Sequence, residues 1–194
     1  MMRYHFDAAL PFELTLEAFR AAVESRGAEL TEHIARGPAR LEETIWQLPG
    51  EPTAVRYIRD HFVDVAFARI ESERRGRPAD AMRELEAVIA FRYAPDLLRQ
   101  TASSDPGTRA YALRSLAVTT PSYRVDVYDA ICAALFDGDP RLRGTAMKVI
   151  ARWPYARFAG ELERLAATEA VPELQREAVR LAADLVAHGR RGLS

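Results

Sequence analysis

The segments DPGTRAYALRSL (residues 105–116) and DPRLRGTAMKVI (residues 139–150) decide the fold that the sequence predicts. Each begins with Asp-Pro, which is typical of a helix start because aspartate caps free N–H groups and proline already has a helical φ. A third segment begins at Pro172, and the prolines of the three copies are 34 and then 32 residues apart. This spacing predicts a repeated helical unit of about 33 residues.

Apolar side chains recur within the repeats at the spacing of one helix face. In the second copy, the residues at i, i+4, i+7, i+8 and i+11 are Leu142, Ala146, Val149, Ile150 and Trp153. The series returns 32 residues later with Leu174, Ala178, Leu181, Ala182 and Leu185. Similar runs at residues 127–135 and 158–166 predict a second helix in each unit, so each unit is expected to be a helical hairpin.

Before residue 104 the same organisation is expected with less regularity. Prolines and glycines separate four further segments that we expect to be helical, at residues 38–48, 52–73, 78–91 and 95–102. Two short helices are expected at residues 15–25 and 28–35. Residues 3–8 fit either a strand or an extended arm, and residues 190–194 are expected to fray.

These elements together predict an all-α fold, a right-handed α-solenoid of about five helical hairpins with a divergent N-terminal cap. We expect a cap or arm at residues 1–36, divergent hairpins at residues 37–103 and regular repeats at residues 104–194, which form one continuous solenoid. In such a stack each unit buries its apolar face only against its neighbours.

The opening segments resemble the first helix of short HEAT-like repeats of the phycobilisome-lyase type, in which Asp-Pro is followed by Val-Arg, an alanine and a leucine. The second copy fits closely and the first has Thr108 in the valine place, whereas the third has Val171 and Gln175 in place of the aspartate and the arginine. In that family the aspartate and the arginine form a hydrogen-bonded ladder between repeats. The resemblance therefore implies structural roles for Asp105, Arg109, Asp139 and Arg143. Tetratricopeptide repeats have a similar period, but their Trp…Leu-Gly…Tyr signature is absent.

Composition limits the class of protein. The 194 residues are 48% hydrophobic and 28% charged, which argues against an intrinsically disordered chain. Lys and Arg number 27 against 28 Asp and Glu, so the net charge of −1 argues against attraction of the whole surface to nucleic acid or membrane. The single cysteine, Cys132, predicts a reducing, cytoplasmic location. No apolar run approaches the roughly 20 residues of a membrane span, so no membrane partner is expected.

Motifs for phosphate loops, nucleophile elbows and zinc sites do not occur in the sequence. We therefore expect a protein that is not an enzyme, with no catalytic residue, no cofactor and no metal. His61 and Asp64 lie three residues apart in the helix expected at residues 52–73, so metal ligation stays open beside the interpretation of His61 as a packing residue. Trp46 and Trp153 are expected to pack in the core.

The resemblance implies that second helices line the concave side of the stack and bind a protein partner, as in a non-catalytic scaffold or adaptor. The candidate contact residues are Arg56, Arg59, Tyr123, Arg124, Asp126, Tyr155, Arg157, Glu161 and Arg164. The alternative is a nucleic-acid-binding protein of the DNA-alkylation-repair glycosylase type. Residues 140–194 carry ten basic and six acidic side chains, which leaves a net charge of −5 for residues 1–139. Because a DNA-binding groove would need basic residues along its whole length, the acidic first part disfavours this alternative. A bilin-handling lyase is a third possibility, although no residue marks a chromophore site.

Overall fold

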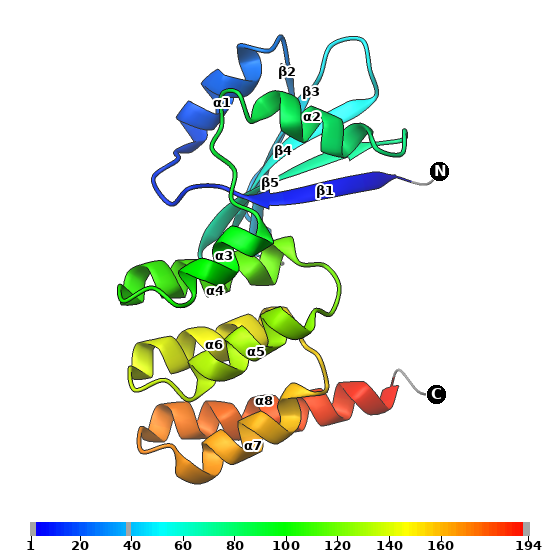
Figure 1. Cartoon of the computed structure of the whole chain (residues 1–194). Coiled ribbons are helices and arrows are strands. Elements are labelled where there is room, and N and C mark those ends of the chain that lie inside the picture. Colours follow the sequence, from blue (N-terminus) through cyan, green and yellow to red (C-terminus); the bar gives the residue numbers. More distant parts are fainter. Residues whose placement is uncertain (1–2, 38–39, 192–194) are drawn as a thin grey trace. The chain divides into compact units, whose positions relative to one another are not determined.

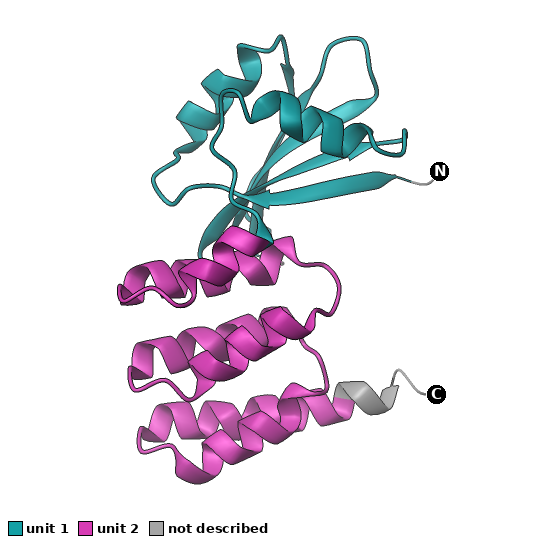
Figure 2. Ribbon diagram, viewed as in Figure 1, with its two compact units in different colours: residues 1–94 teal, residues 95–194 magenta. Residues whose placement is uncertain are grey.

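The computed structural model of the chain describes residues 3–37 and 40–191 (Figure 1). The chain divides into two compact units, residues 1–94 and residues 95–194, which we call unit 1 and unit 2 (Figure 2). Unit 1 is built on a β-sheet, and unit 2 is helical. Pro38, where a helix start is predicted, and residues 192–194 of the predicted tail lie outside the described residues.

Unit 1 contains a five-stranded antiparallel sheet with the strand order β1-β5-β4-β3-β2. Its strands are β1 (Tyr4–Ala9), β2 (Glu29–Ile34), β3 (Leu41–Gln47), β4 (Thr53–Asp60) and β5 (Val65–Ser72). Helix α1 (Leu16–Glu24) connects β1 to β2, and α2 (Arg77–Leu85) follows β5. The first strand therefore pairs with the last, which places Asp7 opposite Arg69.

This sheet shows that the predicted all-α solenoid is wrong, and with it a solenoid of HEAT-like repeats running through the chain. Strands β2 to β5 occupy segments for which the sequence analysis predicts helices. In β4, Val55 and Tyr57 belong to the buried core whereas Arg56 between them points to the other face. Such alternation, together with β-branched and aromatic residues, favours a strand over a helix.

Tight turns connect these strands. Gly50, with a φ of 72°, takes the left-handed conformation that glycine tolerates, between β3 and β4. Between β4 and β5, the Asp60 carboxylate accepts hydrogen bonds from the backbone N–H groups of Phe62 and Val63 at 2.9 and 3.2 Å. Asp64 completes that turn with a φ of 58°. His61 and Asp64 therefore lie in a turn and not on a helix.

The core of unit 1 lies between one face of the sheet and the two helices. Phe19 of α1 is fully buried, with its ring centroid 5.7 Å from Trp46 and 5.4 Å from Tyr57. The Trp46 indole N–H donates to Oε1 of Glu24, the last residue of α1, at 3.3 Å. Helix α2 adds Met82 and Leu85 to this cluster. The sequence-based prediction that Trp46 packs in the core is confirmed.

The described part of unit 2 contains six helices, the first of which begins at the last residue of unit 1. They are α3 (Ala94–Gln100), α4 (Pro106–Thr119), α5 (Val125–Leu135), α6 (Pro140–Arg152), α7 (Phe158–Thr168) and α8 (Pro172–Arg191). Helices α4, α6 and α8 stack in one layer, and α5 and α7 stack in a second layer (Figure 1). Short turns join α5 to α6 and α7 to α8, and the two helices of each pair pack against each other. Each hairpin thus combines the second helix of one repeat with the first helix of the next.

The sequence-based predictions of helix starts in unit 2 are confirmed. Helices α4, α6 and α8 begin at Pro106, Pro140 and Pro172. Asp105 caps α4 by accepting a hydrogen bond from the Thr108 N–H at 2.7 Å, and Asp139 caps α6 by accepting one from the Arg141 N–H at 2.9 Å. The predicted apolar faces are mostly buried, with Leu174 and Ala166 partly exposed, and Trp153 is only 5% exposed.

Replacing Phe19 with alanine should destabilise unit 1 by about 3–5 kcal/mol, because removing the buried ring between Trp46 and Tyr57 would leave a cavity. Urea unfolding followed by Trp46 fluorescence, in a Trp153→Phe background, measures this loss. Phe12→Ala is the matched control, since the Phe12 side chain is 69% exposed. Equal unfolding midpoints for the two variants would contradict the described core.

Candidate functional site

Two turns of unit 2 lie at the same end of its helices (Figure 1). Residues 120–124 join α4 to α5, and residues 153–157 join α6 to α7. Because α4 and α6 pack against each other and both end here, the two turns are neighbours. They bring together most of the sequence-predicted contact residues of unit 2. We call these residues, together with Trp153, the aromatic–arginine patch. Its members are Tyr123, Arg124, Asp126, Trp153, Tyr155 and Arg157.

Three rings form the centre of the patch. The Tyr123 ring lies parallel to buried Trp153, with an interplanar angle of 4° and a centroid distance of 6.1 Å. Tyr155 packs with its edge against both rings, at 4.4 Å from Trp153 and 5.3 Å from Tyr123. The Trp153 indole N–H is buried without a hydrogen-bond acceptor among the described residues, so packing alone fixes the ring. Tyr123 and Tyr155 remain partly exposed on this fixed base.

Arg157 extends the patch toward solvent. Its guanidinium carbon lies 5.1 Å above the centroid of the Tyr123 ring, and Nη1 donates to the Tyr123 hydroxyl at 3.2 Å. No carboxylate of the described residues forms an ion pair with this exposed arginine. A cation held by a ring and a hydroxyl keeps its full charge and most of its N–H donors available. Arg157 is therefore suited to bind an anionic group from another molecule.

Arg124 and Asp126 form a charge-neutral pair beside the rings. Arg124 donates from Nη2 and Nε to the two oxygens of Asp126 at 2.6 and 3.1 Å. These hydrogen bonds lower the pKa of the Asp126 carboxyl, and the N–H of Val127 in the first turn of α5 lowers it further. The pair presents both signs of charge in a fixed geometry.

Glu161 and Arg164 lie on α7, outside the aromatic–arginine patch. Arg164 Nη1 binds Glu161 Oε2 at 2.7 Å, and its guanidinium lies 4.9 Å above the ring of Phe136.

Beside this pair, on α5, burial raises the pKa of the Cys132 thiol. Burial and the contact with Cys132 likewise raise the pKa of Tyr128 to about 12. Both groups therefore stay neutral near pH 7, where a thiolate nucleophile or a phenolate base would be needed for chemistry.

Arg56 and Arg59 do not belong to this site, since both lie on β4 of unit 1 and not on a second helix of a solenoid. Arg56 binds Glu43 and Glu71, each at 2.9 Å. Arg59 forms an ion pair with Asp64. The expectation that these two arginines line a concave helical surface is therefore wrong, because the segment is a strand whose arginines already have acidic partners.

His61 has a partner in the sheet of unit 1. Its Nε2 lies 3.0 Å from Glu42 Oε2, so a hydrogen bond to a strand residue holds the ring. No group of three or more His, Cys, Asp or Glu side chains is arranged to hold a metal ion in residues 3–37 and 40–187.

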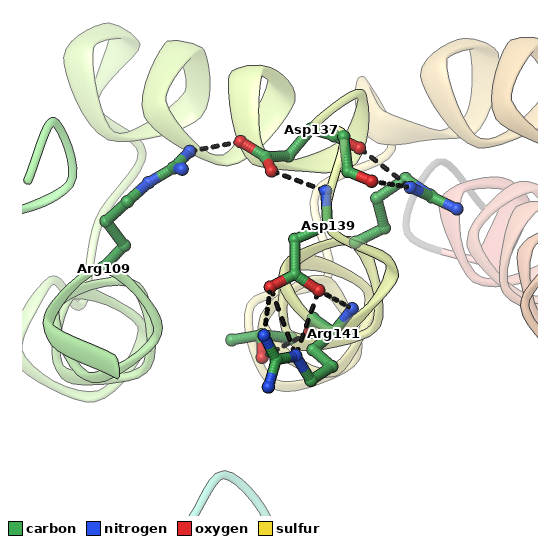
Figure 3. Close-up of polar contacts among 7 residues, drawn as sticks. Arg109, Asp137, Asp139 and Arg141 are labelled. Atoms are coloured by element: carbon green, nitrogen blue, oxygen red, sulfur yellow. Dashed lines mark hydrogen bonds and ion pairs between the residues drawn. The ribbon is translucent and has the colours of Figure 1, made fainter. Parts of the chain in front are cut away.

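At the opposite end of the helices, arginines link successive hairpins of unit 2. Arg109 of α4 forms an ion pair with Asp137, which lies in the turn between α5 and α6 (Figure 3). Arg143 of α6 binds Glu169, in the turn between α7 and α8, through two hydrogen bonds of 2.7 Å. Both arginines also donate to backbone carbonyls of the turn before their own helix, Thr101 and Asp137. We call these contacts the arginine ladder.

The acids of the ladder differ from those that the family resemblance implies. Asp139 binds Arg141 of its own helix (Figure 3), and Asp105 binds Thr108 of its own helix. Both aspartates are helix caps, whereas Asp137 and Glu169 pair with the arginines. Each of these two acids also accepts the backbone N–H two residues later, at 2.8 and 2.9 Å. These contacts lower the pKa of both carboxyls, mainly through that backbone N–H for Asp137 and through Arg143 for Glu169.

One signal in the sequence could have identified these acids. Asp137 and Glu169 are 32 residues apart, which is the spacing of the second and third repeats. The third repeat has Gln175 where the others have arginine, and Gln175 Nε2 still donates to a backbone carbonyl, that of Ala166 in the last turn of α7, at 2.9 Å. It forms no ion pair, because an amide carries no charge. The ladder therefore ends at α8.

No protein-family model, curated protein or solved structure matches the chain. None of the helices in the described part of the chain is both long and apolar enough to cross a bilayer.

Glu169→Gln should reduce the stability of unit 2 by about 3 kcal/mol at pH 7, because it leaves the mostly buried Arg143 guanidinium without its counter-charge. The lowered pKa of Glu169 means that this stabilisation is present above the ordinary value of 4.5 and is lost as the pH falls below it. Urea unfolding monitored by circular dichroism at several pH values measures the difference.

Glu173→Gln is the control for this measurement, since Glu173 pairs with Arg176 on the surface, where both side chains are more than 70% exposed. Its effect should stay below about 1 kcal/mol. A Glu169→Gln variant as stable as this control at pH 7 would exclude the ladder as a major source of stability.

Proposed function

We propose that this protein is a non-catalytic, cytoplasmic protein-binding module, and that its partner docks on the aromatic–arginine patch of unit 2. The observation that carries this proposal is the exposed Arg157 guanidinium, which rests on Tyr123 and has no acidic partner in the described residues. Arginine and tyrosine dominate the binding energy of many protein interfaces. The proposal does not rest on a relation of unit 2 to HEAT-like repeats, which stays a prediction.

The partner chemistry follows from the groups that are free at the patch. Arg157 offers N–H donors for a carboxylate, and an arginine can bind a carboxylate through two parallel hydrogen bonds. The exposed parts of Tyr123 and Tyr155 offer ring surface for an apolar side chain beside that carboxylate. A protein segment with an acidic residue next to an apolar residue fits both features.

The charges around the patch support a protein partner over a nucleic acid. Arg124 and Arg164 are neutralised by Asp126 and Glu161. On the ladder side, Arg109 and Arg143 are neutralised by Asp137 and Glu169. A duplex-binding surface needs several arginines or lysines that are free to replace counterions along the phosphates. Among the described residues of the patch, Arg157 is the arginine without an acidic partner, and a single cation would give weak nucleic-acid binding with little dependence on salt.

Affinity capture from a lysate of the source organism, with protein identification by mass spectrometry, tests this proposal. Wild-type protein should retain a specific partner, and Arg157→Glu should lower its recovery at least about tenfold, because the new carboxylate repels the partner's acid. Tyr123→Leu should also weaken recovery, since it removes the ring that supports the guanidinium. The recovered partner should then bind the purified wild-type protein directly in a calorimetric titration.

Arg176→Glu is the matched control, because it makes the same change from a positive to a negative side chain. Arg176 is exposed on α8, which is not part of the patch. It should retain the partner at the wild-type level. Equal recovery with Arg157→Glu and with wild type would contradict the proposed site. Retention of material that nuclease treatment removes would favour the nucleic-acid alternative instead.

A further inference from the structure

Unit 1 contains a pocket of about 360 Å³ beside its core. Three segments form its wall: the turn after α1 supplies Arg26, the turn between β3 and β4 supplies Leu48 and Pro49, and α2 supplies one of its faces. Sites for small molecules are concave and typically have volumes of about 300–1,000 Å³. The pocket therefore has room for a small ligand at the lower end of this range.

Apolar side chains form one part of the pocket lining. Leu48 and, on α2, Ala81 and Leu85 belong to the buried core of unit 1, and Pro49 is exposed beside them. The core already fixes the three buried side chains, and proline has little side-chain freedom to lose. An apolar ring or chain that packs there would leave water without ordering flexible protein groups.

The charged groups that α2 contributes to the pocket neutralise each other. Arg77 donates from Nη1 and Nη2 to the two carboxylate oxygens of Glu84, at 2.7 and 3.3 Å. Its Nε donates to Glu51, which lies in the turn between β3 and β4. Glu84 thus lines the pocket with both oxygens engaged by an arginine. Arg77, which two acids share, has no charge left for a ligand.

Arg26 is the cation at the pocket that lacks a counter-charge. Its exposed side chain forms no ion pair and no hydrogen bond with the described residues. Its backbone is held in place, since the N–H groups of Arg26 and Gly27 donate to the carbonyls of Val23 and Glu24. A methyl group added at Gly27 would meet Pro49 Cγ at 3.5 Å, so the two turns touch. The fold therefore fixes the backbone of a free arginine beside the apolar lining.

We propose that this pocket binds a small organic molecule with one negative charge, which pairs with Arg26, and an apolar ring or chain, which packs on Leu48 and Pro49. An arginine can bind a carboxylate through two parallel hydrogen bonds. A second negative charge on the ligand would find no free cation, because Arg77 is already paired, and Glu84 would repel it. This site lies in unit 1 and is independent of the partner site on the aromatic–arginine patch.

NMR titration of the full chain with 4-phenylbutyrate tests this proposal, since this probe has one carboxylate and a phenyl ring on a short chain. The amide resonances of residues 26–28, 48–50 and 81–85 should shift in a saturable manner, with a dissociation constant on the order of 1 mM. The neutral 4-phenylbutyramide should bind at least about fivefold more weakly, because it lacks the charge that pairs with Arg26. Inorganic pyrophosphate, which has several charges and no apolar part, should not displace the probe.

Arg26→Gln should weaken the binding of 4-phenylbutyrate at least about fivefold and leave that of the neutral amide unchanged. Arg26→Lys, which keeps the charge, should bind the probe more tightly than Arg26→Gln. Arg36→Gln is the matched control, because Arg36 is exposed in the loop after β2 and also forms no ion pair with the described residues. It should bind like wild type.

Three results would overturn the proposal. The first is the absence of a saturable shift at the pocket residues, and the second is equal affinity of wild type and Arg26→Gln for 4-phenylbutyrate. The third is displacement of the probe by pyrophosphate, which would indicate a site for anions in general. None of these results bears on partner capture by unit 2, so the two proposals can fail separately.

Discussion

The helical unit depends on two arginines that each bind a turn of the next hairpin. Arg109 reaches Asp137, and Arg143 reaches Glu169, whose side chain is only 1% exposed. Each arginine also donates to a backbone carbonyl of the turn before its own helix, so it connects that turn to the turn of the next hairpin. These contacts join helices that are neighbours in the layer but distant in sequence. Without them, each hairpin would have only its apolar face to define its position.

The ladder and the aromatic–arginine patch lie at opposite ends of the same helices, and they use different chemistry. At the ladder end, charge is almost fully neutralised by short side-chain contacts, which suits a structural role. At the patch end, Tyr123, Trp153 and Tyr155 are fixed by ring packing, and Arg157 keeps an unpaired charge. Fixed rings under a free cation reduce the entropy lost on binding, so this end is suited to recognition.

The sequence allowed the helical unit to be predicted but not the sheet. Asp-Pro caps and apolar residues at regular helical spacing are local signals, and they predict α4 to α8 well. Antiparallel pairing is not local: β1 finds its partner in β5, where Arg69 binds Asp7. The alternation of Val55, Arg56 and Tyr57 is a strand signal, but it spans few residues and does not show which other segments pair with it. The sequence analysis selected Tyr123 and Arg157, which the structure brings together. It missed Asp137 and Glu169, whose 32-residue spacing was their only sequence signal, because a loop acid does not show which arginine it will bind.

The central claim is that the partner binds at the turns that carry the aromatic–arginine patch. Hydrogen–deuterium exchange of the full chain, with and without the captured partner, tests it most directly, since bound backbone amides exchange more slowly. The account predicts slower exchange for residues 121–128 and 154–160, with unit 1 and the ladder turns unchanged. Protection of unit 1 alone, with these two segments unaffected, would contradict it.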